Sequence, residues 1–345
     1  MNHYCTYFDR GFLLQGVALA RSLVAQDPAA VLWVLALDEE TAGALRDLNK
    51  PALRVVPLAE LEAADPALVA VKPTRSRAEY YFTLSPCWPR WLLHNRPEIA
   101  RLVYLDADLY FFSSPQPIWD ALDRGSVLLV AHRFPDFLRH YERHGKYNVG
   151  VLGWRRDRDG LACLDWWRER CLEWCFDRLE ADRYADQKYL EAWPQRFGGV
   201  VECRHPGVNL APWNWMNHRY DHPSGAVQVD GQPLVVFHFA RFRAIRGDWW
   251  WQSGQLDYGV MPAALRHALY GAYWRALQSA AAETGREVPA TTARLGRAFW
   301  RTLPLRLVFG SDWLRVGDRF VSGRLGLGRY SGRFLAALRR IFLRA

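Results

Sequence analysis

Two carboxylates lie two residues apart near the end of an apolar run. The run, residues 101–112, is rich in β-branched and aromatic side chains, carries Asp106 and Asp108, and leads into a Ser-Ser-Pro turn. On a strand, side chains two residues apart point to the same side, so both acids can meet one hard cation if the strand ends near Asp108. Two aspartates leave most of a divalent ion's shell open to water and phosphate oxygens. The pattern predicts either a metal site for a diphosphate, such as a nucleotide-sugar, or a turn with two solvated carboxylates.

The stretches around this run predict an open sheet with helices on both sides. Strand and helix patterns alternate within the first 57 residues, and the strands are almost continuously apolar, which favours parallel pairing. Such sheets bind ligands at the carboxyl ends of their strands. We expect strands over residues 3–8, 31–38, 53–57, 101–112, 126–131, 146–154, 200–203 and 234–239. We expect helices over residues 12–24, 39–48, 58–68, 78–84, 88–94, 118–122 and 159–178.

Charge is distributed unevenly along the chain. The 345 residues carry a formal net charge of +9, yet residues 286–345 alone hold 13 Arg, no Lys and three acids, so the preceding part is close to neutral. A nucleic-acid-binding surface spread over the fold is therefore disfavoured. We expect an α/β domain over residues 1–285 and a basic, helical C-terminal extension over residues 286–345.

The extension interleaves Arg with Trp, Leu and Phe, which is typical of amphipathic helices. Two placements fit this pattern. The helices either lie on an anionic inner-membrane face, where cationic and apolar side chains both contribute to binding, or pack on the domain or on a partner. No signal peptide and no run of 18 uncharged apolar residues is visible. We expect a cytoplasmic protein that is peripheral on the membrane if the first placement holds.

Other positions also have a functional and a structural interpretation. Residues 72–77 form a basic loop before a predicted helix, which suits an anionic ligand or is simply a solvated turn. Residues 209–215 combine amides and indoles, as in a sugar-binding surface or a packing corner. Asp186 stands at the head of a predicted helix, where a capping role is sufficient to explain it. His238, near the end of a strand, is either a core residue or, if it faces the two aspartates, the third ligand of a manganese site.

Five motifs occur in a fixed order along residues 1–245. They are residues 4–9 with the helix that follows, Leu105-Asp106-Ala107-Asp108, residues 147–151, Asp186-Gln187 and Phe237-His238-Phe239. Together they resemble GT-A glycosyltransferases, most of all the glycogenin and lipooligosaccharide galactosyltransferase group. In the same order, they resemble that group's nucleotide-binding start, its Asp-x-Asp metal motif, its Asn-x-Gly substrate strand, its Asp-Gln pair beside the transferred sugar, and its third metal ligand.

The resemblance implies a GT-A-like doubly wound mixed sheet and the transfer of a sugar from a nucleotide-diphospho-sugar. It further implies a UDP-linked donor, a saccharide or lipid-linked saccharide acceptor in surface polysaccharide assembly, and retention of the anomeric configuration. Mn²⁺ or Mg²⁺ would be held by Asp106, Asp108 and His238, and through the ion Asp106 would also contact the donor's diphosphate. The base and ribose would lie against Thr6, Tyr7 and Asp9, and the transferred sugar against Asn148, Asp186 and Gln187.

Two features depart from the group's pattern. Ala240-Arg241-Phe242-Arg243 stands where the group has a Gly-x-x-Lys element at the diphosphate, and the basic residue expected within the helix after the third strand is displaced upstream to Lys72, Arg75 and Arg77. We expect Arg75, Arg77 and Arg241 to supply the positive charge, although an arginine fork is not geometrically equivalent to lysine. The alternative is a non-catalytic saccharide-binding or scaffold protein on the same fold. Against it, a binding module has no need of a metal site.

Overall fold

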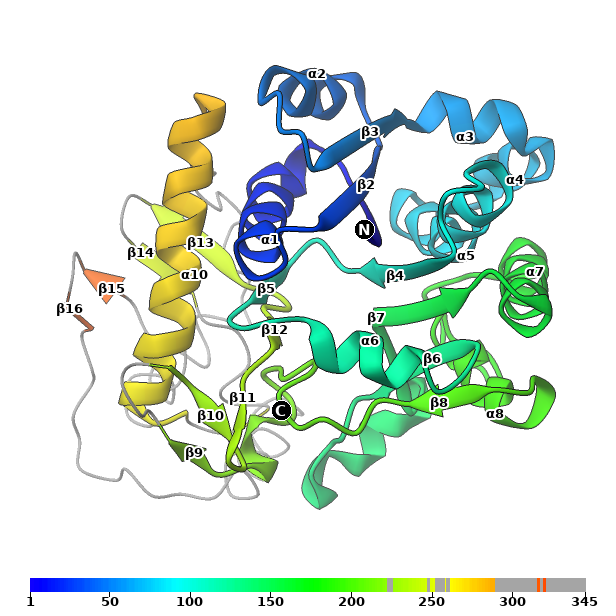
Figure 1. Cartoon of the computed structure of the whole chain (residues 1–345). Coiled ribbons are helices and arrows are strands. Elements are labelled where there is room, and N and C mark those ends of the chain that lie inside the picture. The colour runs from blue at the N-terminus through cyan, green and yellow to red at the C-terminus, as the bar shows by residue number, and fades with distance from the viewer. Residues whose placement is uncertain are drawn as a thin grey trace, which may run out of the picture.

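The centre of the fold is a seven-stranded sheet in the order β3-β2-β1-β4-β7-β6-β8, with helices on both faces (Figure 1). A computed structural model describes residues 1–221, 226–246, 249–251, 258, 261–288, 315–316 and 319–320. The sheet confirms the expected mixed α/β architecture. Its parallel half comprises β1 (Asn2–Phe8), β2 (Ala30–Ala36), β3 (Leu53–Pro57) and β4 (Arg101–Leu105).

The other half of the sheet is mixed. The long strand β7 (Tyr147–Arg155) runs antiparallel to both β4 and β6 (Val127–Ala131). The edge strand β8 (Val200–Glu202) returns parallel to β6. The β7 strand is buried at every position except the last, because helices cover both faces of the sheet there. This strand therefore carries Asn148 and Gly150 into the interior of the molecule.

Two apolar cores lie on opposite faces of the sheet. One core includes side chains of α1 (Leu13–Gln26), α6 (Gln116–Leu122) and α10 (Ala263–Thr284), and α10 lies alongside α1 (Figure 1). The other core includes side chains of α5 (Arg77–Asn95) and α7 (Arg158–Glu173), which pack against each other. Asp65 caps α4 (Pro66–Val71) and also pairs with Arg168 of α7 at 2.7 Å, which ties this face together.

A small second sheet decides where the functional residues lie. In it, β5 (Leu109–Phe111) pairs antiparallel with β12 (Val236–His238), and Leu109 lies opposite His238. Residues 108 and 238 are therefore brought together although they are far apart in sequence. Residue 210 reaches the other edge of β12 through a bridge to Phe237.

The remaining elements are short and connect or border those above. They are η1 (Arg10–Phe12), α2 (Glu39–Asp47), α3 (Leu58–Ala64), η2 (Lys72–Thr74), η3 (Asp136–His144), η4 (Lys188–Ala192), α8 (Trp193–Arg196), η5 (Trp215–Asn217), β9 (Tyr220–Asp221), β10 (Gln228–Val229), β11 (Gln232–Pro233), β13 (Arg243–Arg246), β14 (Trp249–Trp251), β15 (Arg315–Val316) and β16 (Arg319–Phe320).

Three expectations about elements need correction. The strand expected over 101–112 is interrupted after Leu105, so that β4 and β5 belong to different sheets. The helix expected over 58–68 is divided at Asp65 and Pro66, where a second helix begins. The helices expected over 78–84 and 88–94 form one continuous α5, because the proline-containing turn between them is packed into the core and keeps its helical course.

Most of the basic extension lies outside the described residues, so its helical character and its membrane placement stay predictions. The four residues described beyond 288 form the short antiparallel pair β15–β16, where the pattern indicated no strand. None of the helices within the described part of the chain has the length and hydropathy needed to cross a bilayer.

Candidate active site

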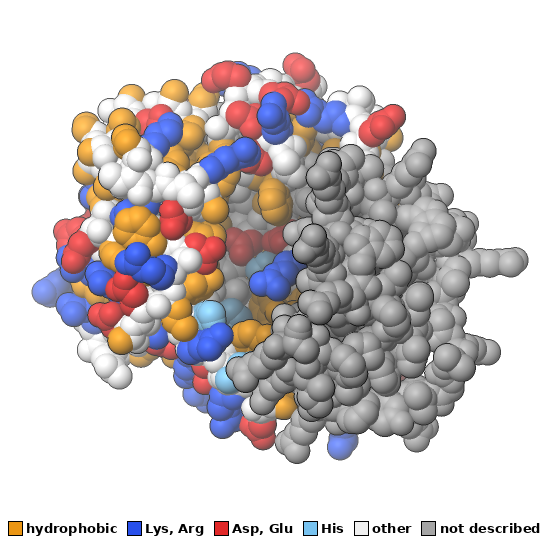
Figure 2. All heavy atoms as spheres, turned by 180° about the vertical axis from the view of Figure 1, so that it is seen from behind, with side chains coloured by type: hydrophobic (Ala, Val, Ile, Leu, Met, Phe, Trp, Pro, Cys, Tyr) orange, Lys and Arg blue, Asp and Glu red, His pale blue; other side chains and the backbone are white. Residues whose placement is uncertain are grey.

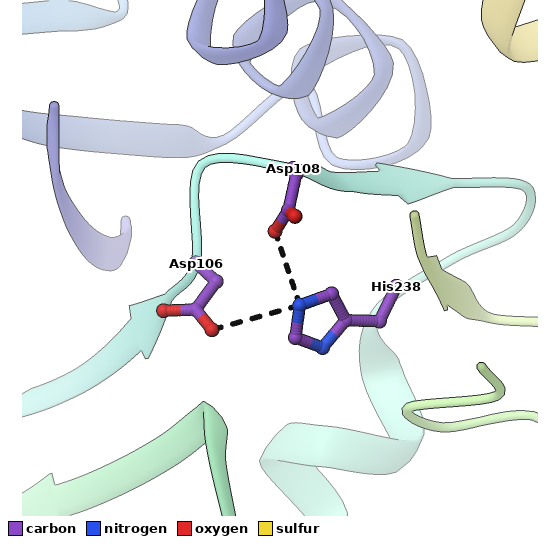
Figure 3. Close-up of side chains that lie close together, drawn as sticks. All are labelled: Asp106, Asp108 and His238. Carbon is purple, nitrogen blue, oxygen red and sulfur yellow. Dashed lines mark ion pairs between the residues drawn. The ribbon is translucent and has the colours of Figure 1, made fainter. Parts of the chain in front are cut away.

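Asp106, Asp108 and His238 converge in the structure. The Nε2 atom of His238 lies 3.1 Å from Oδ1 of Asp108 and 3.7 Å from Oδ2 of Asp106 (Figure 3). One ligand atom from each of the three side chains lies within 4.8 Å of the other two. The Asp106 side chain keeps 30% of its surface exposed, so the cluster is open on one side. Two carboxylates and one imidazole fit a divalent cation with an open coordination position.

Backbone hydrogen bonds hold the two aspartates in a turn. The strand β4 ends at Leu105, the Asp106 N–H donates to the carbonyl of Gly150 at 3.0 Å, and the Leu109 N–H donates back to the Asp106 carbonyl at 3.2 Å. The Phe239 N–H donates to the Asp108 carbonyl at 2.9 Å. The carboxylates therefore converge because the chain turns at residues 106–108, and the explanation from alternation along one strand is wrong.

Electrostatic interactions among the three side chains shift the pKa values of His238 and Asp106. Burial lowers the pKa of His238, but the carboxylates of Asp108 and Asp106 outweigh that effect, and the pKa is raised above its ordinary value. Burial raises the pKa of Asp106, His238 opposes that rise, and Asp108 adds to it. The Tyr104 hydroxyl donates to Asp106 Oδ1 at 2.8 Å and fixes that carboxylate. Two neighbouring carboxylates in a partly buried corner favour a positive charge beside them.

Gly150 makes the close approach of His238 possible. A Cβ atom on this residue would lie 2.6 Å from Oδ1 of Asn148 and 2.9 Å from Nδ1 of His238, closer than real Cβ contacts allow. Gly150 is the glycine of the Asn-x-Gly pattern that the sequence resemblance assigns to a substrate strand. In the structure, the imidazole ring takes that space.

Asn148 lies behind the metal cluster in a hydrogen-bonded group of amides. Its Oδ1 accepts from the Gly150 N–H and from Nδ2 of Asn209, both at 3.0 Å, and its Nδ2 lies 3.2 Å from Nε2 of His132. The Trp213 ring meets the His238 ring edge to face at 5.2 Å. The residues 209–215 thus border the site. Asn209 and His132 were not among the predicted site residues, although the amides and indoles of residues 209–215 had been noted in the sequence.

Asp186 reaches the site from the loop before η4. The preceding Ala185 has a positive φ of 45°, and the Trp167 indole N–H donates to the Asp186 carbonyl at 2.8 Å. Burial raises the pKa of Asp186 to about 7, the Ser85 hydroxyl counters part of that rise, and Asp106 adds to it. The capping explanation fails, because η4 begins after Gln187 and has no side-chain cap. Gln187 instead donates to the His144 carbonyl at 3.1 Å.

The residues predicted for the base and ribose lie at the end of β1. Thr6 is fully buried, and its hydroxyl has no hydrogen-bond partner. The Asp9 carboxylate accepts from the Gly11 N–H at 2.8 Å and from the Tyr81 hydroxyl at 3.1 Å, and it also pairs with the guanidinium of Arg77. Asp9, predicted to contact the nucleotide, and Arg77, predicted to supply positive charge for its phosphates, therefore contact each other in the structure.

The other predicted cations lie in different surroundings. Arg75 donates to the Leu172 carbonyl at 3.2 Å, and its guanidinium covers the ring of Phe176 at 3.9 Å, so it packs on the end of α7 and is not brought to the metal cluster. Arg241 follows β12, is exposed and has a positive φ of 62°. Figure 2, which views the molecule from behind relative to Figure 1, shows a hollow in which acidic, basic and histidine side chains gather.

Comparison with solved structures returns glycosyltransferases. The chain is similar to mouse xyloside xylosyltransferase 1, with 14% identity and a TM-score of 0.44 over 70% of this chain and 98% of that one. It is similar to the galactosyltransferase LgtC in complex with donor and acceptor sugar analogs, with 18% identity and a TM-score of 0.46 over 77% of this chain and 100% of that one.

Sequence comparison places the chain in a family. It is 34% identical over 250 residues to the uncharacterized protein YfnF of Bacillus subtilis (strain 168), which covers 70% of this chain and 82% of that protein. It is 30% identical over 246 residues to the uncharacterized protein YfnD of the same strain, covering 70% and 78%. No protein-family model matches. The chain belongs to the family that contains YfnF and YfnD.

Gly150→Ala should weaken metal binding without unfolding the protein. The new methyl group would displace the His238 ring, and disturbing the surroundings of a metal ligand typically reduces affinity by roughly 10- to 100-fold. Titration with Mn²⁺ followed by electron paramagnetic resonance measures the effect, and circular dichroism checks the fold. Gly43→Ala is the matched control, because no atom lies within 4 Å of the added Cβ. Unchanged Mn²⁺ affinity in Gly150→Ala would contradict this role of the glycine.

Asp186→Asn should change how stability depends on pH. An acid with a raised pKa in the folded state stabilises the fold fully below its unfolded pKa of about 4, and the contribution is lost as pH rises towards about 7. Because asparagine does not ionise, the variant does not lose stability in this way as the pH rises. Its free energy of unfolding, measured in urea without added metal, should therefore gain on the wild type by roughly 2–4 kcal/mol between about pH 4 and 8. Asp47→Asn, on the exposed surface of α2, should show no such gain. A pH-independent difference for Asp186→Asn would refute the raised pKa.

Proposed function

We propose that this protein is a metal-dependent glycosyltransferase that moves a sugar from a nucleotide-diphospho-sugar to a saccharide or lipid-linked saccharide. The observation that carries the proposal is the convergence of Asp106, Asp108 and His238 on one point at the edge of the sheet. These side chains come from two distant segments, and a buried third carboxyl, Asp186, is close enough for its pKa to depend on Asp106. A cation site beside a second acid suits the departure of a charged leaving group better than simple saccharide binding.

The three ligands would hold Mn²⁺ or Mg²⁺, which would act as a Lewis acid on the diphosphate and stabilise the charge that develops on the leaving nucleotide. The His238 ring would bind through Nε2, the atom that faces both carboxylates. The Tyr104 hydroxyl would keep Asp106 oriented while the ion is bound. Electrostatic stabilisation of this kind is usually the largest contribution to such a reaction.

The end of β1 supports the nucleotide side of the proposal. Thr6 and Tyr7 lie on β1 and Asp9 directly follows it, beside the strand β4 that ends just before Asp106, so the phosphates of a nucleotide placed there would lie near Asp106 and Asp108. The Asp9 carboxylate would accept hydrogen bonds from base or ribose groups, whereas the Thr6 hydroxyl is fully buried and has no partner in the described structure. Arg77 beside Asp9 and the exposed Arg241 would add positive charge for the diphosphate. A UDP-linked donor and retention of configuration rest on the motif resemblance.

The sugar side of the proposal rests on Asn148, Asp186 and the loop after β8. Asn148 and Asp186 would face the transferred sugar, and Trp213 would offer an apolar ring surface near His238. Sugars bind to such surfaces through their C–H faces, while amide and carboxyl groups select the hydroxyls. Gln187 contributes by fixing the His144 carbonyl and the loop around it. An acceptor in surface polysaccharide assembly and a peripheral membrane location are proposed from the sequence resemblance and the basic extension.

Asp108→Asn should remove metal-dependent cleavage of the donor. Incubation with a panel of UDP-sugars, with Mn²⁺ or with a chelator, measures release of UDP. Wild type should release UDP only with the metal, and Asp108→Asn should be slower by roughly 100- to 1,000-fold, as is typical when one stabilising group of such a set is lost. Asp47→Asn replaces an exposed acid of α2 and should release UDP at the wild-type rate. Cleavage by Asp108→Asn at the wild-type rate would remove the metal assignment, and no cleavage of any sugar by the wild type would count against a transferase.

A further inference from the structure

His132 lies directly behind Asn148 and contacts its side-chain amide. The Nε2 atom of His132 is 3.2 Å from Nδ2 of Asn148, and its Nδ1 atom is 3.2 Å from the carbonyl oxygen of Lys146. His132 and Asn148 are each only 6% exposed, so bulk water does not compete for these contacts. The two ring nitrogens face two different protein groups, and the chemistry of those groups determines where the ring proton lies.

The Gly150 backbone fixes the direction in which the Asn148 amide points. A backbone N–H can only donate, so the Asn148 atom that lies 3.0 Å from the Gly150 nitrogen is the acceptor, Oδ1. The Asn209 side chain donates to the same oxygen through Nδ2, also at 3.0 Å. The other end of the amide, Nδ2, therefore carries two protons, and one of them points at His132.

His132 must accept this proton at Nε2, which is possible only for a neutral ring whose own proton is on Nδ1. The Lys146 carbonyl is an acceptor and stands where the Nδ1 proton points. Burial lowers the pKa of His132 to about 4, and the Lys146 carbonyl opposes only part of that effect, so the ring is neutral at neutral pH. Among the described contacts, the second Nδ2 proton of Asn148 is the one side-chain group of this pair that has no protein partner.

The position of His132 is itself fixed by its neighbours. Its backbone carbonyl accepts from the Trp213 indole N–H at 3.1 Å and from Nδ2 of Asn214 at 2.9 Å. Its ring stacks on the ring of Phe134, with the ring centres 4.8 Å apart. The Trp213 ring lies 5.4 Å from the His132 ring and 5.2 Å from the His238 ring, so the same indole borders both. A side chain that is held in this way can fix the direction of the next one.

We propose that His132 is a positioning residue of the transfer site, which accepts one amide proton of Asn148 at Nε2 and so directs the second proton towards the transferred sugar. This inference rests on the proposed function. An amide holds its two protons in one plane, so fixing the first also fixes the second. Asn148 offers the sugar a donor and not its carbonyl oxygen, because Gly150 and Asn209 already occupy Oδ1. The site therefore selects a sugar oxygen that accepts a hydrogen bond at this position.

Comparing UDP with a UDP-sugar isolates the contribution of Asn148, because only the sugar would contact it. Titration calorimetry in the presence of Mn²⁺ measures both affinities. His132→Leu, which has no acceptor, should weaken binding of a UDP-sugar by roughly 3- to 10-fold and leave the affinity for UDP unchanged. His132→Gln can place Oε1 near the position of the ring Nε2 and should restore most of the affinity. In the Asn148→Ala background, His132→Leu should cause no further loss, since its effect passes through Asn148.

His3→Leu is the matched control. His3 is also largely buried and accepts from an indole N–H, that of Trp33 at 3.3 Å, but it lies at the start of β1, at the opposite end of that strand from the candidate site. This variant should bind the UDP-sugar as the wild type does. Equal weakening of UDP and UDP-sugar binding in His132→Leu, a His132→Gln variant as weak as His132→Leu, or additive losses of His132→Leu and Asn148→Ala would each overturn the positioning role.

A second measurement needs neither ligand nor turnover. In protein labelled with ¹⁵N at histidine, long-range ¹H–¹⁵N correlation spectra near neutral pH distinguish protonated from unprotonated ring nitrogens. The His132 signals are identified by their absence in His132→Gln. Nδ1 should be protonated and Nε2 unprotonated, and the Nε2 signal should move in Asn148→Ala but not in His3→Leu. A proton on Nε2 would overturn the inference. If the wild type binds no nucleotide-sugar but the ring behaves in this way, the proposed function fails while the pairing of His132 with Asn148 stands.

Discussion

The close approach of two carboxylates in a partly buried corner is the constraint on which the rest of this structure depends. Like charges repel strongly where water is scarce, so Asp106 and Asp108 hold their positions only because other groups fix them. Backbone bonds from Asp106 to Gly150 and from Phe239 to Asp108 fix the turn, and Tyr104 fixes one carboxylate. The imidazole of His238 offsets part of the negative charge. A divalent cation would offset the rest, which is why the geometry is understood best as a metal site.

The topology explains why this corner forms where it does. The chain builds β1, β2 and β3 in one direction across the sheet and then places β4 on the other side of β1. Ligands bind at such switch points, because the loops after the two central strands diverge and leave room between them. Asp9 follows one of those strands and Asp106 follows the other. The small β5–β12 sheet then adds His238 from a segment more than a hundred residues away in sequence.

Sequence patterns were sufficient for most of the central sheet and for finding the two acids and the histidine that converge. Continuous apolar runs identify β1, β2 and β6 because both faces of those strands are covered, and two acids after such a run mark the turn of the candidate metal site. The sequence did not show why the two aspartates converge, because their convergence depends on a turn that is held by the Gly150 carbonyl of β7. Two separate helices were expected over 78–84 and 88–94, but packing against α7 keeps α5 continuous through Pro86 and Pro89.

Positions whose role depends on long-range contacts were harder to predict. A basic loop before a helix suggested a phosphate site at Arg75, but the side chain donates to a carbonyl at the end of α7 and covers the ring of Phe176, which follows that helix. Ser85 carries no local signal, because a serine inside a helix is ordinary, and the amides and indoles of residues 209–215 did not single out Asn209. Only the folded chain places them beside Asp186 and Asn148. The direction of Gln187 towards the His144 carbonyl is likewise a consequence of loop packing.

The central claim is that two aspartates and one histidine from distant segments bind a single divalent cation together. Anomalous X-ray diffraction at the manganese edge, from crystals grown with Mn²⁺ and UDP, tests it most directly. The account predicts one strong peak at about 2.0 to 2.4 Å from an oxygen of Asp106, an oxygen of Asp108 and Nε2 of His238, with further coordination by phosphate oxygens. A crystal in which UDP is bound but manganese is absent from this cluster, or is held without His238, would contradict it.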